Sequence, residues 1–246
     1  MNRYERQEII KEIGVEGQKK LKNSKVLVIG AGGLGSPIEM YLAAAGVGTI
    51  GIVDGDAVDE SNLNRQIIHD TDNVGINKAE SAKQRLKKIC PDVNVICYPY
   101  YITNENAENI ISSYDVIIDA VDNFETRFLV NDICVLQKKV FIHGGVIRFN
   151  GQVLTYVPGM GPCYRCIFDD VPEEGEVPTS KEVGILGASA GIIGSIQAME
   201  AIKYITGVGE LLTGKMLIID GLTMNTRVAK FPKINPNCPV CNRKNK

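Results

Sequence analysis

Short apolar runs alternate with amphipathic segments of helical length in the first part of the chain. Such runs predict the buried strands of a parallel sheet. They lie at Lys25–Gly30, Thr49–Asp54, Val93–Tyr98, Asp115–Asp119 and Val140–Gly145. The intervening segments predict helices at Gly32–Gly46, Asn77–Cys90, Asn104–Ser112 and Phe124–Gln137. This alternation predicts a doubly wound, Rossmann-like α/β fold with a mainly parallel sheet.

The pattern changes after residue 146. Strand-like runs at Gln152–Val157, Met216–Asp220 and Arg227–Phe231 predict antiparallel C-terminal strands that extend the sheet. Gly187–Thr206 predicts a long helix, and the acidic, Pro- and Gly-rich segment Asp169–Glu182 predicts a mobile surface loop. We expect a single domain (1–246), built from an N-terminal helical segment (1–24) and two halves (25–146 and 147–246).

The first residues predict a short amphipathic helix that carries Arg3, Arg6, Ile9, Ile10 and Ile13. The three isoleucines follow an i, i+1, i+4 pattern and should pack on protein. The two arginines are i, i+3 neighbours on the helix surface. The segment has no pattern of a secretory signal peptide.

Composition and charge exclude some classes of protein. The 246 residues carry a formal net charge of −2 with a pI of about 5.8, so no basic field indicates nucleic-acid binding. The longest apolar helix candidate contains Gln197, Glu200 and Lys203, which makes it a poor membrane span. We therefore expect a cytoplasmic protein that binds neither nucleic acid nor membrane.

A glycine-rich turn follows the first predicted strand. Gly30-Ala31-Gly32-Gly33-Leu34-Gly35 stands where glycines permit close approach of a phosphate and a helix N-terminus favours the anion. Asp54 ends the next strand, where a carboxylate can bind a ribose hydroxyl. Taken alone, this fingerprint indicates an NAD-dependent oxidoreductase.

The polar residues that follow favour a triphosphate instead. Arg65 and Lys78 suit additional phosphate charge, and Asp122 lies past the fourth strand, where a carboxylate can hold Mg²⁺. The candidate nucleotide-binding residues are Gly30, Gly32, Gly33, Gly35, Asp54, Asp56, Asn62, Arg65, Gln66, Lys78, Asp122 and Asn123.

Four of the seven cysteines form two Cys-x-x-Cys pairs, Cys163–Cys166 and Cys238–Cys241. Two such pairs far apart in the sequence predict a closed, tetrahedral and structural Zn²⁺ site. A redox dithiol is the alternative, although neither pair opens a thioredoxin-like βαβ unit. The remaining cysteines sit singly in apolar patterns and are expected in the core.

Several motifs together resemble the ThiF/MoeB/HesA family, relatives of the ubiquitin-activating enzymes. They are Arg3-Tyr4-Glu5-Arg6-Gln7, Gly30–Ser36, Asp54–Gln66, Lys78, Ala120–Asn123 and the two cysteine pairs. The resemblance implies an adenylyltransferase that uses ATP and releases pyrophosphate. Its implied substrate is the C-terminal Gly-Gly carboxylate of a small ubiquitin-like sulfur carrier, similar to ThiS or MoaD.

The resemblance also implies residue roles. Asp54 would bind the ribose, Asn62, Arg65 and Lys78 the phosphates, and Asp122 would assist Mg²⁺. Arg6 would reach the ATP of the neighbouring subunit in a homodimer. The implied catalytic residues are Arg6, Arg65, Lys78 and Asp122.

Ser180 stands where members of the family often carry a loop cysteine. A hydroxyl is a much weaker nucleophile, which puts a thiol-dependent covalent step in doubt but not adenylation. No rhodanese-like extension follows Lys246, so we expect a separate sulfur donor. His143 is expected to be structural, and His69 receives no role.

Several readings of the function stay open. The alternatives to carrier adenylation are an NAD-dependent oxidoreductase, a non-catalytic relative that only binds a partner, and adenylation of a peptide or RNA-linked carboxylate. The pathway, whether thiamin, molybdopterin or another thiocarboxylate route, also stays open.

Overall fold

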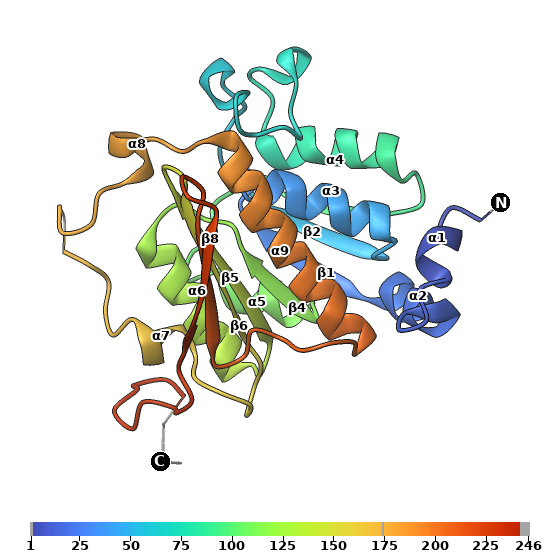
Figure 1. Cartoon of the computed structure of the whole chain (residues 1–246). Coiled ribbons are helices and arrows are strands. Elements are labelled where there is room, and N and C mark those ends of the chain that lie inside the picture. The colour runs from blue at the N-terminus through green and yellow to red at the C-terminus, as the bar shows by residue number, and fades with distance from the viewer. Residues whose placement is uncertain (1, 174, 242–246) are drawn as a thin grey trace.

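One eight-stranded sheet forms the centre of the molecule (Figure 1). The computed structural model describes residues 2–173 and 175–241, without the side chains of residues 180 and 181. The strands are β1 Lys25–Ile29, β2 Thr49–Val53, β3 Asn94–Tyr98, β4 Val116–Asp119, β5 Val140–Ile147, β6 Asn150–Tyr156, β7 Lys215–Asp220 and β8 Asn225–Lys230. Their order is β3-β2-β1-β4-β5-β6-β7-β8, with β1 to β5 parallel and β6 to β8 added antiparallel. The predicted fold class is confirmed.

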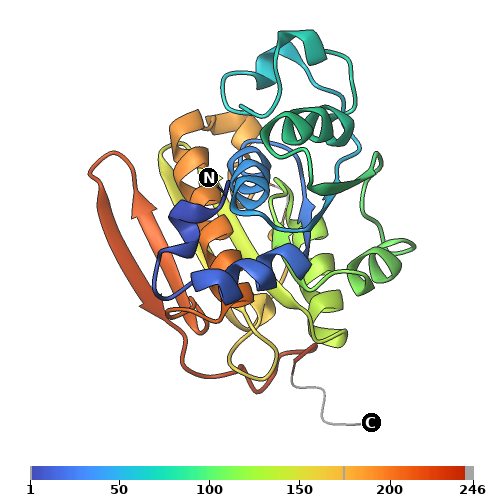
Figure 2. The ribbon, with the colours of Figure 1, turned by 90° about the vertical axis from the view of Figure 1, so that its right-hand side faces the viewer.

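Helices cover both faces of the sheet. They are α1 Glu5–Glu8, α2 Gly14–Asn23, α3 Gly35–Ala45, α4 Lys78–Ile89, α5 Ala107–Ser112, α6 Phe124–Leu136, α7 Tyr164–Ile167, α8 Ser180–Val183 and α9 Gly187–Thr206, with short 3₁₀ turns η1 Glu60–Asn62 and η2 Thr71–Asn73. Helices α3, α4 and α9 pack on one face, and α5 and α6 on the other. Figure 2 shows the sheet between the two layers, with α9 in orange and α5 and α6 in green.

The apolar runs are continuous because the sheet is buried on both sides. In β1, Val26 and Val28 join the core under α3, α4 and α9, whereas Leu27 and Ile29 join the core under α5 and α6. Side chains of a strand alternate between the two faces, so a strand covered on both faces needs an apolar residue at every position.

The N-terminal segment differs from the prediction. Helix α1 has four residues and leaves out Arg3 and the three isoleucines, so the prediction of one helix carrying all five was wrong. Ile9 and Ile10 are 65% and 45% exposed and do not form a packed stripe within the chain. The chain turns between α1 and α2, and Gly14, the first residue of α2, has a φ of +58° that glycine adopts readily.

The segment predicted as a surface loop connects α7 to α9. It forms no strand in its described residues, and α8 lies at its end. Its mobility stays a prediction. None of the helices in the described part of the chain is long and apolar enough to cross a membrane.

Candidate active site

A cavity of about 780 Å³ opens at the carboxyl ends of β1, β2 and β4. It gathers most of the candidate residues named from the sequence. Those that line it are Gly30, Gly32, Gly33, Asp54, Asp56, Arg65, Gln66, Lys78, Asp122 and Asn123. Gly35, Asn62 and Arg6 are not among its described lining residues. Open parallel sheets bind ligands at this edge, so the position agrees with a nucleotide site.

Glycine is needed in the turn for two different physical reasons. Gly30 has a φ of +102°, and a Cβ there would lie 2.6 Å from the Ala120 carbonyl oxygen. A Cβ at Gly35 would lie 2.0 Å from the Gly30 carbonyl oxygen. The nearest atoms to a Cβ at Gly32 and Gly33 lie at 3.6 and 3.3 Å. The outer glycines are therefore required by packing, and the middle two leave the backbone accessible from the cavity.

The turn presents backbone N–H groups to the cavity. The Ala31 N–H donates to Asp54 Oδ2 at 2.8 Å, and the Asp56 N–H donates to Asp54 Oδ1 at 2.9 Å. Among the described residues, the N–H groups of Gly32, Gly33 and Leu34 have no acceptor. Unpaired N–H groups ahead of a helix N-terminus form an anion site.

Two cations face this turn. Lys78 Nζ lies 2.9 Å from Asp56 Oδ2, and its side chain is only 8% exposed. The Tyr101 hydroxyl donates to the other oxygen of Asp56. Arg65 Nη1 donates to the Ser61 carbonyl oxygen at 2.9 Å, which holds its guanidinium beside the cavity. This side of the cavity suits a polyanion.

Asn62 has a local role that the sequence reading missed. Its side chain closes a capping box with Asp59, since Asn62 Oδ1 accepts from the Asp59 N–H at 3.3 Å. Its carbonyl oxygen accepts from the Arg65 N–H at 3.1 Å. Asn62 thus shapes the loop that carries Arg65.

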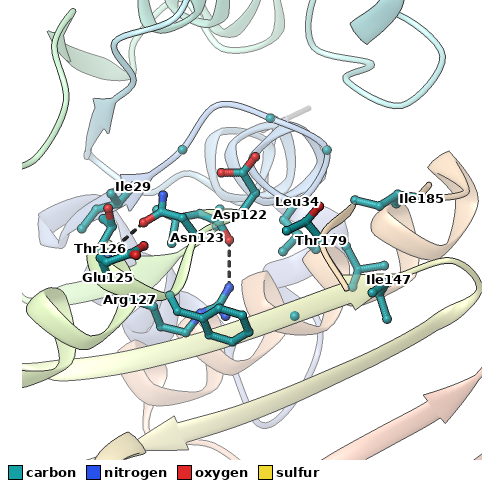
Figure 3. A pocket seen from close by; sticks show the side chains of 18 of the residues that line it. Ile29, Leu34, Asp122, Asn123, Glu125, Thr126, Arg127, Ile147, Thr179 and Ile185 are labelled. Carbon is teal, nitrogen blue, oxygen red and sulfur yellow. Dashed lines mark hydrogen bonds between the residues drawn. The ribbon is translucent and has the colours of Figure 1, made fainter. Parts of the chain in front are cut away.

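The turn after β4 carries Asp122. The Val121 N–H donates to Asp119 Oδ1 at 3.1 Å, and the Val121 carbonyl accepts from Arg127 Nη2 at 2.9 Å. Asn123 Oδ1 accepts from the Thr126 N–H at 2.9 Å and caps α6. Figure 3 shows the exposed Asp122 carboxylate on the opposite side of this turn from Arg127. Both residues that flank Asp122 are therefore fixed, and its carboxylate faces the cavity.

A buried charge network lies beneath the Asp122 turn. Asp119 is 1% exposed, and its Oδ2 accepts from Arg127 Nε at 2.9 Å and from His143 Nδ1 at 2.7 Å. Burial raises the pKa of Asp119, but Arg127 and the His143 hydrogen bond more than offset this effect, and the net pKa is lowered. Burial lowers the pKa of His143. An ionised carboxylate only accepts, so neutral His143 carries its proton on Nδ1.

The second half of the chain contributes one end of the cavity, through side chains that the sequence alone did not single out. Its side chains include Ile147 of β5, Ile185 between α8 and α9, and Thr179 of the segment after α7. Figure 3 shows them beyond Leu34, on the other side of Asp122 from Asn123 and Glu125. We call Leu34, Ile147 and Ile185 the apolar end. The side chain of Ser180, next to Thr179, lies outside the described residues.

The two cysteine pairs meet in space. The four Sγ atoms of Cys163, Cys166, Cys238 and Cys241 all lie within 4.8 Å of one another. Cys163 Sγ lies 3.9 Å from Cys166 Sγ and 3.7 Å from Cys238 Sγ, while Cys166 and Cys241 are closer, at 3.2 Å. A Zn–S bond of about 2.3 Å places tetrahedral sulfur atoms about 3.8 Å apart. The cluster therefore fits a tetrahedral metal ion.

The cysteine cluster packs on α6. The Tyr164 N–H donates to Asn131 Oδ1 at 2.9 Å, and the Tyr164 ring contacts the rings of His143 and Phe128 at centroid distances of 4.8 and 5.1 Å. The Asn235 N–H points at Cys166 Sγ at 3.4 Å, the kind of donor that supports a metal-bound thiolate. The cluster thus packs against α6, the same helix that begins at the Asp122 turn.

Known proteins are similar to this chain over nearly its whole length. The ThiF family model matches residues 4–240. The chain is 46% identical to "Adenylyltransferase and sulfurtransferase MOCS3" of Drosophila sechellia, over 97% of this chain and 53% of that protein. It is 45% identical to "Sulfur carrier protein adenylyltransferase" of Thermus thermophilus, over 98% of this chain and 90% of that protein. The chain thus spans about half the length of the Drosophila relative.

A solved structure shares the fold. "Crystal structure of E. coli MccB + ATP" superposes with a TM-score of 0.86 at 26% identity, over 98% of this chain and 73% of that chain. These relatives give no support to an NAD-dependent oxidoreductase.

Proposed function

Since the chain belongs to the ThiF family, we propose that it adenylates the C-terminal glycine carboxylate of a ubiquitin-like sulfur-carrier protein. The observation that carries the proposal is one cavity with three kinds of groups. Unpaired N–H groups and two cations line it together with the Asp122 carboxylate and the apolar end. An oxidoreductase would need no such set of cations beside Asp122.

The nucleotide half of the site is residues 25–146. The N–H groups of Gly32 to Leu34, with Arg65 and Lys78, would bind the phosphates, and Asp54 would bind the ribose. Gln66 and Asn123 complete the lining. Asp122 would hold Mg²⁺, which neutralises phosphate charge when bound. Lys78 and Asp56 are already paired, so Lys78 is held in place before the nucleotide arrives.

The second half, residues 147–246, would bind the carrier. The extended C-terminus of the carrier would enter at the apolar end, with the carrier's carboxylate beside Asp122. A carboxylate oxygen attacks the α-phosphorus, and the bond from that phosphorus to pyrophosphate breaks. In this adenylation step the protein forms no covalent bond and contributes positioning and charge neutralisation. Arg65 and Lys78 supply the positive charge that neutralises the phosphates.

The N-terminal motif supports a site shared between two copies. Arg3 Nη1 donates to the Ile89 carbonyl oxygen at 2.7 Å, and Gln7 Nε2 donates to the Ala45 carbonyl oxygen at 3.0 Å. These carbonyls end α4 and α3, on the side of the sheet where the parallel strands begin. The cavity lies at the opposite edge, where those strands end. Figure 1 shows α1 and α8 at opposite ends of the molecule.

Arg6 has no anchoring role among the described residues. Tyr4 contacts Cys90 Sγ through its hydroxyl at 3.6 Å, whereas Arg6 is exposed and has no hydrogen-bond or ion-pair partner among the described residues. It cannot reach its own cavity from the other edge of the sheet. We propose that it completes the site of a second copy in a homodimer, and exposed Ile9 and Ile10 supply apolar surface near that contact.

Complementation tests the shared site. Arg6→Ala and Asp122→Ala are each expected to be nearly inactive as homodimers. In a heterodimer of the two, one site lacks both groups and the other is wild-type, so up to about half of the activity returns. Absence of recovery after proven subunit exchange would place Arg6 outside the partner's site.

We also propose that the four-cysteine cluster holds a structural Zn²⁺. All four ligand positions are thiolates, so no open position remains for chemistry. The cluster would staple the C-terminal segment to α7.

The proposed activity is tested by ATP–pyrophosphate exchange. Exchange should require Mg²⁺ and a carrier ending in Gly-Gly, and it should be lost when the last glycine is deleted. Exchange that persists undiminished with the shortened carrier, or proceeds with a free peptide instead, would show a different carboxylate substrate.

A further inference from the structure

His69 is buried between α4 and the glycine-rich turn, with 6% of its surface exposed. Its Nε2 lies 2.9 Å from the Ala31 carbonyl oxygen, and its Nδ1 lies 2.8 Å from Ser81 Oγ. Both ring nitrogens are thus engaged, one by the turn and one by a helix. The proposed function gives this residue no role.

The partners decide the tautomer of His69. The Ala31 carbonyl can only accept a hydrogen bond, so Nε2 must carry the proton and donate. Nδ1 then has no proton and accepts from the Ser81 hydroxyl. Burial lowers the pKa of His69 and favours this neutral form. The imidazole therefore connects α4 to the turn with one defined direction of donation.

The hydrogen bond to Ala31 sets the direction of a phosphate-facing N–H group. The Ala31 carbonyl and the Gly32 N–H belong to one planar trans peptide unit and point in opposite directions. When His69 holds the carbonyl toward the protein interior, the Gly32 N–H must face away from it. Asp54 holds the N–H of the preceding peptide unit.

The turn needs this support because glycine on one side permits rotation. Gly32 has no side chain, and its neighbour Gly33 has none either, so the peptide units between them can adopt several orientations at little cost. The Ser36 hydroxyl, which donates to the Gly32 carbonyl at 2.7 Å, orients the following unit. His69 is the corresponding support for the unit before it.

We propose that His69 is a positioning residue that aims the Gly32 N–H at the nucleotide phosphates and is itself held by Ser81. The inference rests on the proposed nucleotide site. It predicts an effect confined to ligands that carry phosphates, because the ribose and base do not use the Gly32 N–H. A residue that merely supports the fold would alter the binding of all nucleotide-like ligands alike.

The experiment compares ATP with adenosine, each titrated by calorimetry with Mg²⁺ present. His69→Leu removes the donor, and we expect about tenfold weaker ATP binding with adenosine binding unchanged. His69→Gln retains an N–H donor at the distance of Nε2, and it should restore most of the ATP affinity. Ser81→Ala keeps the ring but releases its far side, and a smaller loss, about two- to fivefold, is expected with the same selectivity.

The outcomes separate this inference from the proposed function. If His69→Leu binds ATP like the parent, or weakens ATP and adenosine equally, the positioning role is wrong while adenylation can stand. If His69→Leu does not fold, Ser81→Ala decides by the same comparison. If the parent binds ATP and shows the expected selectivity but supports no carrier-dependent exchange, the function is wrong and the positioning role holds. A parent that binds no ATP overturns both.

Discussion

A methyl group at Gly30 should separate the two turns that form the site. The φ of Gly30 is +102°, and a Cβ there would lie 2.6 Å from the carbonyl oxygen of Ala120, which begins the Asp122 turn. That carbonyl cannot move freely, because the Ala120 N–H donates to the Ile29 carbonyl at 2.9 Å. The clash is between the new methyl group and a backbone carbonyl that is held in place, so Gly30→Ala must displace one turn from the other.

The chain offers a matched control for this variant. Gly75 has a φ of +87°, and a Cβ there would meet no atom within 4 Å. Gly75→Ala therefore measures the backbone strain alone, about 1–2 kcal/mol. The clash in Gly30→Ala adds about 1–3 kcal/mol, as overpacking typically does. Each kcal/mol lowers the Tm of a chain of this size by about 2–4 °C.

The assay is thermal unfolding of both variants together with the KM for ATP in pyrophosphate exchange. Gly30→Ala should lose roughly twice the stability of Gly75→Ala. It should also raise the KM for ATP, because the glycine turn moves from its support, whereas Gly75→Ala should leave that KM unchanged. Equal Tm values and equal KM values for the two variants would refute the tight contact between the turns.

Three further predictions concern the surroundings of the site. Arg127→Lys keeps the charge but cannot bind Asp119 and the Val121 carbonyl together, so kcat of exchange should fall about ten- to hundredfold with a smaller change in KM for ATP; an unchanged kcat would contradict the network. Burial, and secondarily the charge of Asp54, raise the pKa of Glu39 well above its ordinary value, and neither carboxyl oxygen is hydrogen-bonded among the described residues. The folded chain keeps Glu39 protonated, whereas the unfolded chain ionises it above the ordinary pKa of about 4.3, so the folded state loses stability as pH rises. Glu39→Met should therefore stabilise the protein by about 1–3 kcal/mol at pH 7.5, and by less near pH 4.5. Calorimetry that finds the same gain at both pH values would exclude the titration of Glu39. Elemental analysis of fresh protein should find one zinc per chain. Removal of zinc by a chelator should increase hydrogen exchange first in the C-terminal segment and only later in the glycine turn. Protein without zinc would favour a dithiol.

The sequence predicts the sheet well because strands buried on both faces need continuous apolar runs, as in residues 26–29 of β1 and 116–118 of β4. The prediction of the N-terminal helix was wrong because contacts with distant parts of the chain shape this segment. Arg3 and Gln7 donate hydrogen bonds to carbonyl oxygens at the ends of α4 and α3. Local pattern cannot reveal such contacts across dozens of residues.

The candidate site was predictable by residue type more than by role. The glycine fingerprint includes Gly35, although packing against Gly30 explains it. The Asp119–His143 pair arises from the register of β4 and β5, in which the two residues are direct partners. His69 likewise depends on a contact 38 positions away in the chain. Register and long-range contact leave no spacing signal in a single sequence.

The proposed function requires that this chain transfers an adenylyl group to a carrier carboxylate. Intact-mass spectrometry of a small ubiquitin-like carrier ending in Gly-Gly, after incubation with the chain and Mg²⁺·ATP, tests it directly. We expect an AMP adduct on the carrier, converted by hydroxylamine to a C-terminal hydroxamate, and no adduct on a carrier whose C-terminus is amidated. A carrier that keeps its mass with active, ATP-binding protein, or an adduct that survives C-terminal amidation, would contradict it.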